Sequence, residues 1–534
     1  ILILILFILI SKLAFSQSVS KKVKYGGRIM YDMAVWGADE MDKTGTEFRR
    51  VRLFNSGEVY GNIKYKLQLD FAGGKIAFKD VWMELGDMPA NGKLRVGHFK
   101  EPLRLEALTS SKYISFMERG LPIAFSMMII GFFGLTYIIG LEPALAMVGQ
   151  VFFDNGMSYS LSILPLFLLM GNFVVKAGLA DELYSASNAW LRHKKGGLAM
   201  ATVLACGGFS SVCGSSLATA ATMAKIALPS MKKYGYSDSL STGVIAAGGT
   251  LGILIPPSMI LVIYGIITSQ DIGQLFLAGI VPGLLGIVGY IIAVKISLWF
   301  EKDSYTIPPP LPFLEKVKAL KGVIGILSLF TIVMGGIYLG IFTATEAAGI
   351  GAFGSLLIII LKRKISISSF IETLIETAKI TTMLFFLLFG AIVFSNFINL
   401  AGLPNDLKDF LSLFNFNLYT LLIGIFIIYL ILGMILESLS MMMLTVPIFY
   451  PLVSEMGGNL IWFGILVVVA VEISLITPPV GLNVHILKTI VKNTVSLKTI
   501  FKGVIPFVFI DIIRLMILLL VPAITLFLPY SIAS

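Results

Sequence analysis

The chain has 534 residues, of which 57% are hydrophobic and 13% are charged, and its mean hydropathy is +0.90. These values indicate an integral membrane protein rather than a set of soluble domains. The net charge of +10 is spread over the first 119 residues and over loops between apolar segments, so we interpret it as a topology signal and not as nucleic-acid binding. The two cysteines, Cys206 and Cys213, are too few for a disulfide framework and lack metal-ligand spacing, and we expect them to be small packing residues.

The first residues read ILILILFILI, an apolar run too short to span a membrane well. Ala14 and Ser16 place small residues at the offsets expected for cleavage before Gln17. We therefore expect residues 1–16 to be the remnant of a secretory signal peptide.

Residues 17–119 alternate between apolar and polar side chains with period two, most clearly over Val59–Phe71. Shorter alternations lie at Arg28–Trp36, Glu47–Phe54, Ile76–Leu85 and Leu94–Phe99. The pattern predicts about five antiparallel strands with one polar face, of the length of tilted outer-membrane strands. A soluble antiparallel β fragment would give the same alternation. Because a bacterial barrel needs at least about eight strands to close, we do not expect a working pore.

The phrases KYGGRIMYD, GEVYGNIKYKLQLDFAGGKIAFKDVWMELG and LRVGHFKEPLRLEALTSSKYISFMERGLP fall within residues 20–122. This part of the chain resembles the phosphate-selective (O/P-type) porins of Gram-negative outer membranes. The resemblance implies anion passage along arginine and lysine side chains in the lumen.

The sequence of Met117–Ser126 fits both this porin family and the helical region that follows it. The two halves need different membranes, because strands behind a signal peptide are exported whereas long apolar helices stay in the inner membrane. We hypothesise that the chain is a chimaera of two gene fragments joined within this short phrase.

From Leu121 onward, apolar spans of roughly 20 residues follow one another. They lie near residues 121–140, 159–177, 238–268, 274–300, 322–341, 345–361, 379–401, 460–487 and 503–529. Two further segments, residues 196–231 and 417–453, are interrupted in the middle and read as re-entrant hairpins. Basic residues flank both ends of the first, whereas no Lys or Arg occurs from Phe410 to Leu487, so the hairpins should enter the membrane from opposite sides.

Two of the long spans are broken. Gly252–Ser258 contains Pro256 and Pro257, and a similar phrase with Pro478 and Pro479 recurs about 220 residues later. Unpaired backbone groups in lipid cost several kcal/mol each, so such breaks persist where the freed groups face protein, water or an ion. We predict an all-α polytopic membrane protein with inverted repeats, two re-entrant hairpins and broken helices that form a transport site. Two unrelated proline kinks are the alternative.

A sodium ion binds about five or six oxygens, which hydroxyls, carboxylates and freed carbonyls at these breaks can provide. The candidate sodium ligands are Gly214, Ser215, Ser216, Thr219, Gly249, Thr250, Gly252, Glu437, Ser438, Thr477 and Gly481. The candidate substrate-lining residues are Pro256, Pro257, Ser258, Pro478 and Pro479. Small-residue helix packing is the alternative for Ser215 and Ser216.

Three other polar residues lie in or near apolar segments. Glu472, like Glu437, is a functional hypothesis because an ionisable group inside a membrane segment is costly. Glu346 follows Thr343 and fits a helix start, where the dipole favours a carboxylate. His485 fits a packed or interfacial histidine better than a proton carrier.

The phrases LPLFLLMGN, GSSLATAATMAKIALPSMKKYGY, GTLGILIPPS, GIFTATEAAGIGAF and EISLITPPVGLNV occur between residues 121 and 534. This region resembles the large membrane subunit of tripartite ATP-independent periplasmic (TRAP) transporters. The resemblance implies an elevator-type transport domain, sodium-driven uptake of organic acids such as C4-dicarboxylates, and a location in the bacterial inner membrane. It also implies two partners, a small four-helix membrane subunit and a periplasmic substrate-binding protein. The family often has Asp where Glu437 stands, so the second ion site is a less direct match.

We therefore divide the chain into a signal-peptide remnant (1–16), a porin-like β fragment (17–119) and a TRAP-like transmembrane domain (120–534). An outer-membrane anion-selective porin fragment is the alternative function. An intramembrane enzyme fits poorly, because the sequence has no HExxH or GxSxG motif, and no catalytic residue is predicted.

Overall fold

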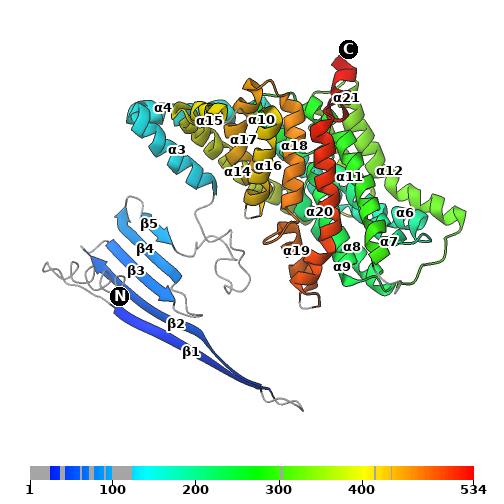
Figure 1. The fold of residues 1–534 in the computed structure, drawn as a ribbon, viewed down its shortest axis with the longest axis horizontal. Helices are drawn as coiled ribbons and strands as arrows, with labels where there is room; N and C mark the ends of the chain where they lie inside the picture. The colour runs from blue at the N-terminus through cyan, green and yellow to red at the C-terminus, as the bar shows by residue number, and fades with distance from the viewer. Residues whose placement is uncertain are drawn as a thin grey trace. The chain divides into compact units, whose positions relative to one another are not determined.

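The computed structural model describes residues 24–36, 43–59, 63–70, 77–88, 92–98, 123–300, 305–413, 417–434, 436–492 and 494–533. The chain divides into two units, Ile1–Pro122 and Ile123–Ser534 (Figure 1). The expected signal-peptide remnant and most of the shared phrase at residues 117–126 lie outside the described residues.

The first unit contains an antiparallel sheet with the order β1-β2-β3-β4-β5. Its strands are β1 (Lys24–Trp36), β2 (Lys43–Val59), β3 (Ile63–Asp70), β4 (Ala77–Met88) and β5 (Gly92–His98). The prediction of one strand over Val59–Phe71 is wrong at its start, because Val59 ends β2 and pairs with Ile63 at the beginning of β3. The polar, glycine-containing text between them reads Tyr-Gly-Asn, which favours a turn over a continuous strand.

The described secondary-structure elements of the second unit are all helices. Its elements are α3 (Ile123–Ile139), α4 (Leu141–Gly156), η4 (Tyr159–Ser162), α5 (Ile163–Lys176), α6 (Leu179–Leu191), α7 (Gly197–Cys213), α8 (Ser216–Lys233), α9 (Asp238–Thr250), η5 (Leu251–Ile253), α10 (Met259–Thr268), α11 (Ile272–Phe300), α12 (Phe313–Tyr338), α13 (Ala344–Leu361), α14 (Ile367–Leu400), α15 (Leu403–Leu413), α16 (Leu418–Gly433), α17 (Ser438–Glu455), α18 (Leu460–Ser474), α19 (Leu482–Val491), α20 (Leu497–Leu520) and α21 (Ala523–Ala533).

Seven described helices are long and apolar enough to cross a membrane. They are Tyr159–Lys176, Ile272–Phe300, Phe313–Tyr338, Ala344–Leu361, Ile367–Leu400, Ser438–Glu455 and Leu497–Leu520. The chain is therefore a multi-pass membrane protein. The prediction of one span over residues 503–529 is wrong, because α20 ends at Leu520 and α21 begins at Ala523, after Pro522. Proline lacks a backbone donor and clashes with the preceding turn, which favours a helix boundary there.

The interrupted segments form helix pairs. In the first, α7 packs against α8, and in the second, α16 packs against α17. The two broken spans are α9 with α10 and α18 with α19. Every residue of α18 from Ile461 to Ser474 is buried, so this helix lies in the centre of the unit. Figure 1 shows α20 beside α11 and α18, and both pairs are in contact.

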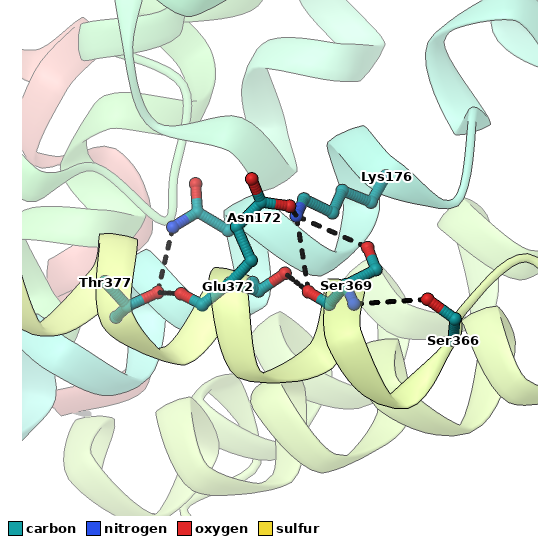
Figure 2. Close-up of polar contacts among 7 residues, drawn as sticks. Asn172, Lys176, Ser366, Ser369, Glu372 and Thr377 are labelled. Atoms are coloured by element: carbon teal, nitrogen blue, oxygen red, sulfur yellow. Dashed lines mark hydrogen bonds and ion pairs between the residues drawn. The ribbon is translucent and has the colours of Figure 1, made fainter.

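A polar seam joins α5 to the first turns of α14 (Figure 2). The Asn172 side-chain amide donates to Thr377 Oγ1 at 2.9 Å. Lys176 Nζ donates to the Ser369 carbonyl at 3.3 Å and to Glu372 Oε2 at 3.2 Å. These contacts fix the end of α5 against α14.

Candidate functional site

The tip of the first hairpin lies inside the protein. Gly214 ends α7 with φ +63°, a conformation that favours glycine, and Ser215 accepts a hydrogen bond from the Ala218 backbone amide to cap α8. Gly214 and Ser216 are buried, and Ser215 is half-buried. Connections between helices usually lie on the surface, so a buried tip is the arrangement expected of a re-entrant hairpin.

This tip packs directly against the first broken helix. A Cβ placed on Gly249 would lie 3.0 Å from the Ser216 carbonyl oxygen, and one on Gly252 would lie 3.2 Å from the Ser215 carbonyl oxygen. A Cβ on Gly214 would lie 3.3 Å from the Pro257 carbonyl oxygen. The structure thus brings the candidate residues of the first tip and the first break together around backbone oxygens.

The first break itself is buried. After α9 and the short η5 turn, the Ser258 side chain caps α10 by accepting from the Leu261 amide at 3.3 Å, and its hydroxyl donates to the Ile253 carbonyl. The Pro256–Pro257 peptide bond is cis, and both prolines are buried. The Ser258 hydroxyl is therefore used within the break, and its role is structural.

Two hydroxyls of the first hairpin are fully buried without a hydrogen-bond partner among the described residues, Ser210 Oγ on α7 and Thr219 Oγ1 on α8. Leaving such a group unpaired costs about 1–3 kcal/mol, so native proteins usually pair it with water or an ion. Ser210 Oγ lies 3.3 Å from the Cβ position of Gly252, next to the tip. These oxygens fit the donor set of a sodium ion. Ser210 was not predicted, although a serine one turn before the Gly214 interruption is a usable signal.

The second hairpin uses a carboxylate where the first uses a hydroxyl. Glu437 caps α17 and accepts from the amides of Leu439 at 3.2 Å and Ser440 at 3.3 Å. The Ser438 hydroxyl donates to Glu437 Oε1 at 3.1 Å. Glu437 stands 222 residues after Ser215, so the two caps occupy matching places in the repeat. The carboxylate of Glu437 is thereby committed to the start of its own helix.

The second break is more exposed than the first. Thr477 Oγ1 donates to the Ile473 carbonyl at 2.6 Å, and Gly481 begins α19 with φ +56°. Pro478 and Pro479, also joined by a cis bond, are exposed. The hairpin packs on this break at Gly433, where an added Cβ would overlap Ser474 Oγ. The described side-chain hydrogen bonds of Glu437 and Ser438 stay within the hairpin.

Glu472 is fully buried and forms an ion pair with Arg514, which also lies 3.0 Å from Asp511. Sequence reasoning named Glu472 but missed its partners. Two opposite charges three residues apart within the apolar helix α20 are the signal that could have revealed them.

The remaining sequence predictions concern packing and capping. Glu346 lies in a capping box with Thr343, which confirms the helix-start interpretation. Both cysteines are free, and Cys206 Sγ lies 2.7 Å from the Cβ position of Gly248, as expected for a packing residue. Among the described residues, no group of three His, Cys, Asp or Glu side chains could hold a metal ion.

Comparison with known proteins adds two family matches. A family described as "Tripartite ATP-independent periplasmic transporter, DctM component" matches residues 113–524. A family described as "Phosphate-selective porin O and P" matches residues 23–134. The two ranges overlap at residues 113–134, which include the phrase that suits both halves.

Curated relatives cover most of the second unit. The C4-dicarboxylate TRAP transporter large permease protein DctM of Pseudomonas aeruginosa is 34% identical over 396 residues, which cover 74% of this chain and 92% of the relative. The sialic acid TRAP transporter large permease protein SiaM of Vibrio cholerae is 31% identical over 425 residues, covering 78% of this chain and 96% of the relative.

Among solved structures, the YdaH transporter of Alcanivorax borkumensis has a TM-score of 0.54 and 13% identity, and the match covers 75% of this chain and 97% of that chain. MtrF of Neisseria gonorrhoeae has a TM-score of 0.50 and 12% identity, with 75% and 93% covered. These two likenesses concern the fold alone.

Proposed function

This chain belongs to the DctM component family of tripartite ATP-independent periplasmic transporters, and on that premise we propose that it is the large membrane subunit of a sodium-coupled organic-acid transporter. One observation carries the sodium coupling. The first hairpin tip meets the first break around backbone oxygens, and among the described residues the same hairpin has two buried, unpartnered hydroxyls, Ser210 beside Gly252 and Thr219 in the first turn of α8. A cation bound there would satisfy oxygens that otherwise cost free energy to bury.

The proposed sodium ligands fall into two sets related by the repeat. At the first set, Ser215, Ser216, Thr219 and the carbonyls around residues 249–252 would hold the ion. At the second, Thr477 and the backbone near Gly481 are the better placed candidates, because the Glu437 carboxylate is already used as a helix cap. Bound sodium would supply positive charge near the broken helices, where an anionic substrate would otherwise meet carbonyl oxygens.

The substrate class follows from the relatives and from the helix ends. Relatives are named for C4-dicarboxylate, sialic acid and 2,3-diketo-L-gulonate transport, and all three substrates are carboxylates. Helices α8, α10, α17 and α19 all begin at the interruptions, and helix N-termini attract carboxylates through their free amides and partial positive charge. We propose that the substrate is a C4-dicarboxylate or a similar organic acid. Its binding site would be lined by the proline breaks at residues 256–258 and 478–479.

The proposal includes an elevator-type movement of the two hairpins, an inner-membrane location and two partners. A small four-helix membrane subunit would complete the membrane part, and a periplasmic binding protein would deliver the substrate. The names of relatives that contain "large permease protein" support such a division into subunits.

Uptake by proteoliposomes tests this function. The full chain is reconstituted with a TRAP small subunit and a TRAP periplasmic binding protein, and uptake of labelled C4-dicarboxylate and sialic acid is followed with a sodium gradient. We expect uptake that disappears when choline replaces sodium, and weaker sodium dependence in Ser216→Ala with Thr477→Val. Uptake that is unchanged in choline would refute the sodium coupling.

The second candidate function, an outer-membrane anion-selective porin fragment, has one supporting observation, the porin family match over residues 23–134. Chloride conductance in planar bilayers, measured with the purified full chain, is its test, and we expect none above the empty membrane. We also propose that the join near residues 113–134 unites two gene fragments. One long sequencing read across the locus, together with the mass of the expressed polypeptide, tests this, and a single uninterrupted product would contradict it.

A further inference from the structure

We propose that five buried side chains, Glu472, Arg514, Asp511, Tyr290 and Thr250, form a positioning network that makes the two sodium sites depend on each other. This inference rests on the function proposed above. We call these residues the inter-break network. Its two ends lie on the last turns of the broken helices α9 and α18, and its middle lies on α11 and α20.

The contacts are continuous from one break to the other. Arg514 Nη2 contacts Glu472 Oε2 and lies 3.0 Å from Asp511 Oδ1. The Tyr290 hydroxyl donates to Asp511 Oδ2 at 2.5 Å and lies 3.0 Å from Thr250 Oγ1. Thr250 is the last residue of α9, and Glu472 lies two residues before the end of α18.

The repeat explains why these two ends are special. Thr250 and Glu472 are 222 residues apart, the same spacing that separates Pro256 from Pro478. Helices α11 and α20, which contribute the middle of the network, each follow one of the broken spans. The inter-break network therefore connects matching positions of the two halves rather than two arbitrary helices.

Every member of the network is at most 2% exposed, and the surrounding packing is built around it. A Cβ on Gly286, one turn before Tyr290, would lie 2.1 Å from Arg514 Nη1, so the absence of a side chain there makes room for the guanidinium. Close approach of Gly243 to Gly503 presses α9 against α20. Separating a buried ion pair is costly because it leaves an uncompensated charge. Since each member of the network contacts the next, a displacement at one end is therefore transmitted to the other.

The network also contacts the Thr250 hydroxyl, a candidate ligand at the first break. The Thr250 hydroxyl donates to the Ala247 carbonyl at 2.7 Å, and its oxygen lies 3.0 Å from the hydroxyl of Tyr290, which itself donates to Asp511. The Ala247 carbonyl and the Tyr290 hydroxyl together hold the orientation of the Thr250 oxygen, and such outer contacts typically change metal affinity by about 10–100-fold.

Tyr290→Phe tests the proposal, because it removes the linking hydroxyl alone. The melting temperature of the purified full chain is measured against sodium concentration, with choline keeping the ionic strength constant. We expect the half-saturating sodium concentration to rise about ten-fold and the Hill coefficient to fall toward one. The matched control is Tyr429→Phe, which removes another fully buried tyrosine hydroxyl, one that pairs with Thr445 inside the second hairpin. The control should keep the wild-type sodium curve.

A Tyr290→Phe curve that matches wild type in both half-saturation and Hill coefficient would overturn the inference. If Tyr290→Phe does not yield folded protein, Glu472→Gln carries the same test from the far end of the network, with the same expected and contradicting results. A wild-type protein without any sodium-specific shift would overturn the proposed sodium coupling instead, so the two failures are distinguishable.

Discussion

The two broken helices share their sequence pattern but not their surroundings. At the first break, Pro256 and Pro257 are buried and the hairpin tip packs on the backbone, whereas at the second break Pro478 and Pro479 are exposed. The hairpin backbone can pack on the first break because Gly249 and Gly252 have no side chains that would fill the space between them. A repeated phrase in the sequence therefore produces matching backbone interruptions without producing matching access.

The largest expected difference between the breaks is chemical access. In a Cys206→Ala, Cys213→Ala background, Pro478→Cys should react with a soluble maleimide about 100-fold faster than Pro256→Cys, because a buried thiol reacts only after local opening that costs ~3 kcal/mol. Each variant loses a proline at the matching position of its break, so each controls for the other. The measurement is the labelling rate in detergent, and equal rates in the native proteins would contradict the comparison. After denaturation both thiols should label at one rate.

The next effect tests the packing that encloses the first break. Gly249→Ala places a Cβ 2.8 Å from Ala220 Cβ, and overpacking of this kind costs about 1–3 kcal/mol. We expect a lower melting temperature and reduced sodium stabilisation. Gly424→Ala on α16 is the matched control, because its added methyl would meet nothing within 4 Å. A Gly249→Ala protein as stable as the control would show that the tip can move away at little cost.

A third prediction compares the threonines of the two sites. Thr219→Val removes a buried hydroxyl without a described partner, so the sodium-free protein should gain about 1 kcal/mol, while its stabilisation by sodium should be lost. Thr477→Val removes a hydroxyl that donates to the Ile473 carbonyl and should lower sodium-free stability by about 1 kcal/mol. Melting curves at zero and saturating sodium measure both. Sodium stabilisation that persists in Thr219→Val would remove this residue from the first site.

The smallest effect concerns the carboxylate cap of the second hairpin. Glu437→Gln keeps an acceptor for the Leu439 and Ser440 amides and loses the charge, which is worth about 0.3–1 kcal/mol at a helix N-terminus. Glu437→Ala also loses the cap and should cost about 1 kcal/mol more. Melting temperatures of the two variants distinguish these contributions. If Gln proves as costly as Ala, the charge has a role beyond capping.

Much of this architecture follows from local sequence. Interruptions by small residues and proline, repeated about 220 residues apart, predict the hairpins and the broken helices, because each signal is contained in a short stretch of chain. Thr343 and Glu346 likewise predict their own capping box. The partition of residues 503–529 into two helices was missed because continuous hydropathy hides the effect of Pro522 on the backbone.

What the sequence could not provide is the pairing of distant groups. Glu472 looks like an isolated charge until tertiary packing brings Arg514 beside it from another helix. Ser210 has no hydrogen-bond partner among the described residues, and Glu437 caps a helix. Both facts depend on the positions of neighbouring backbone groups, which hydropathy does not predict. The unequal exposure of the two proline pairs has the same origin.

The length of α14 has a consequence for how the protein sits in a bilayer. Its 34 residues extend about 50 Å, whereas a hydrocarbon core is about 30 Å thick. Residues 380–400 contain no charged side chain and are long enough to cross that core, so the turns before Ile380, with Glu372 and Lys379, project beyond it. The polar seam with Lys176 lies on this projecting part (Figure 2). The seam therefore lies on the part of α14 outside its uncharged span, where the Lys176 ammonium and the Glu372 carboxylate neutralise each other.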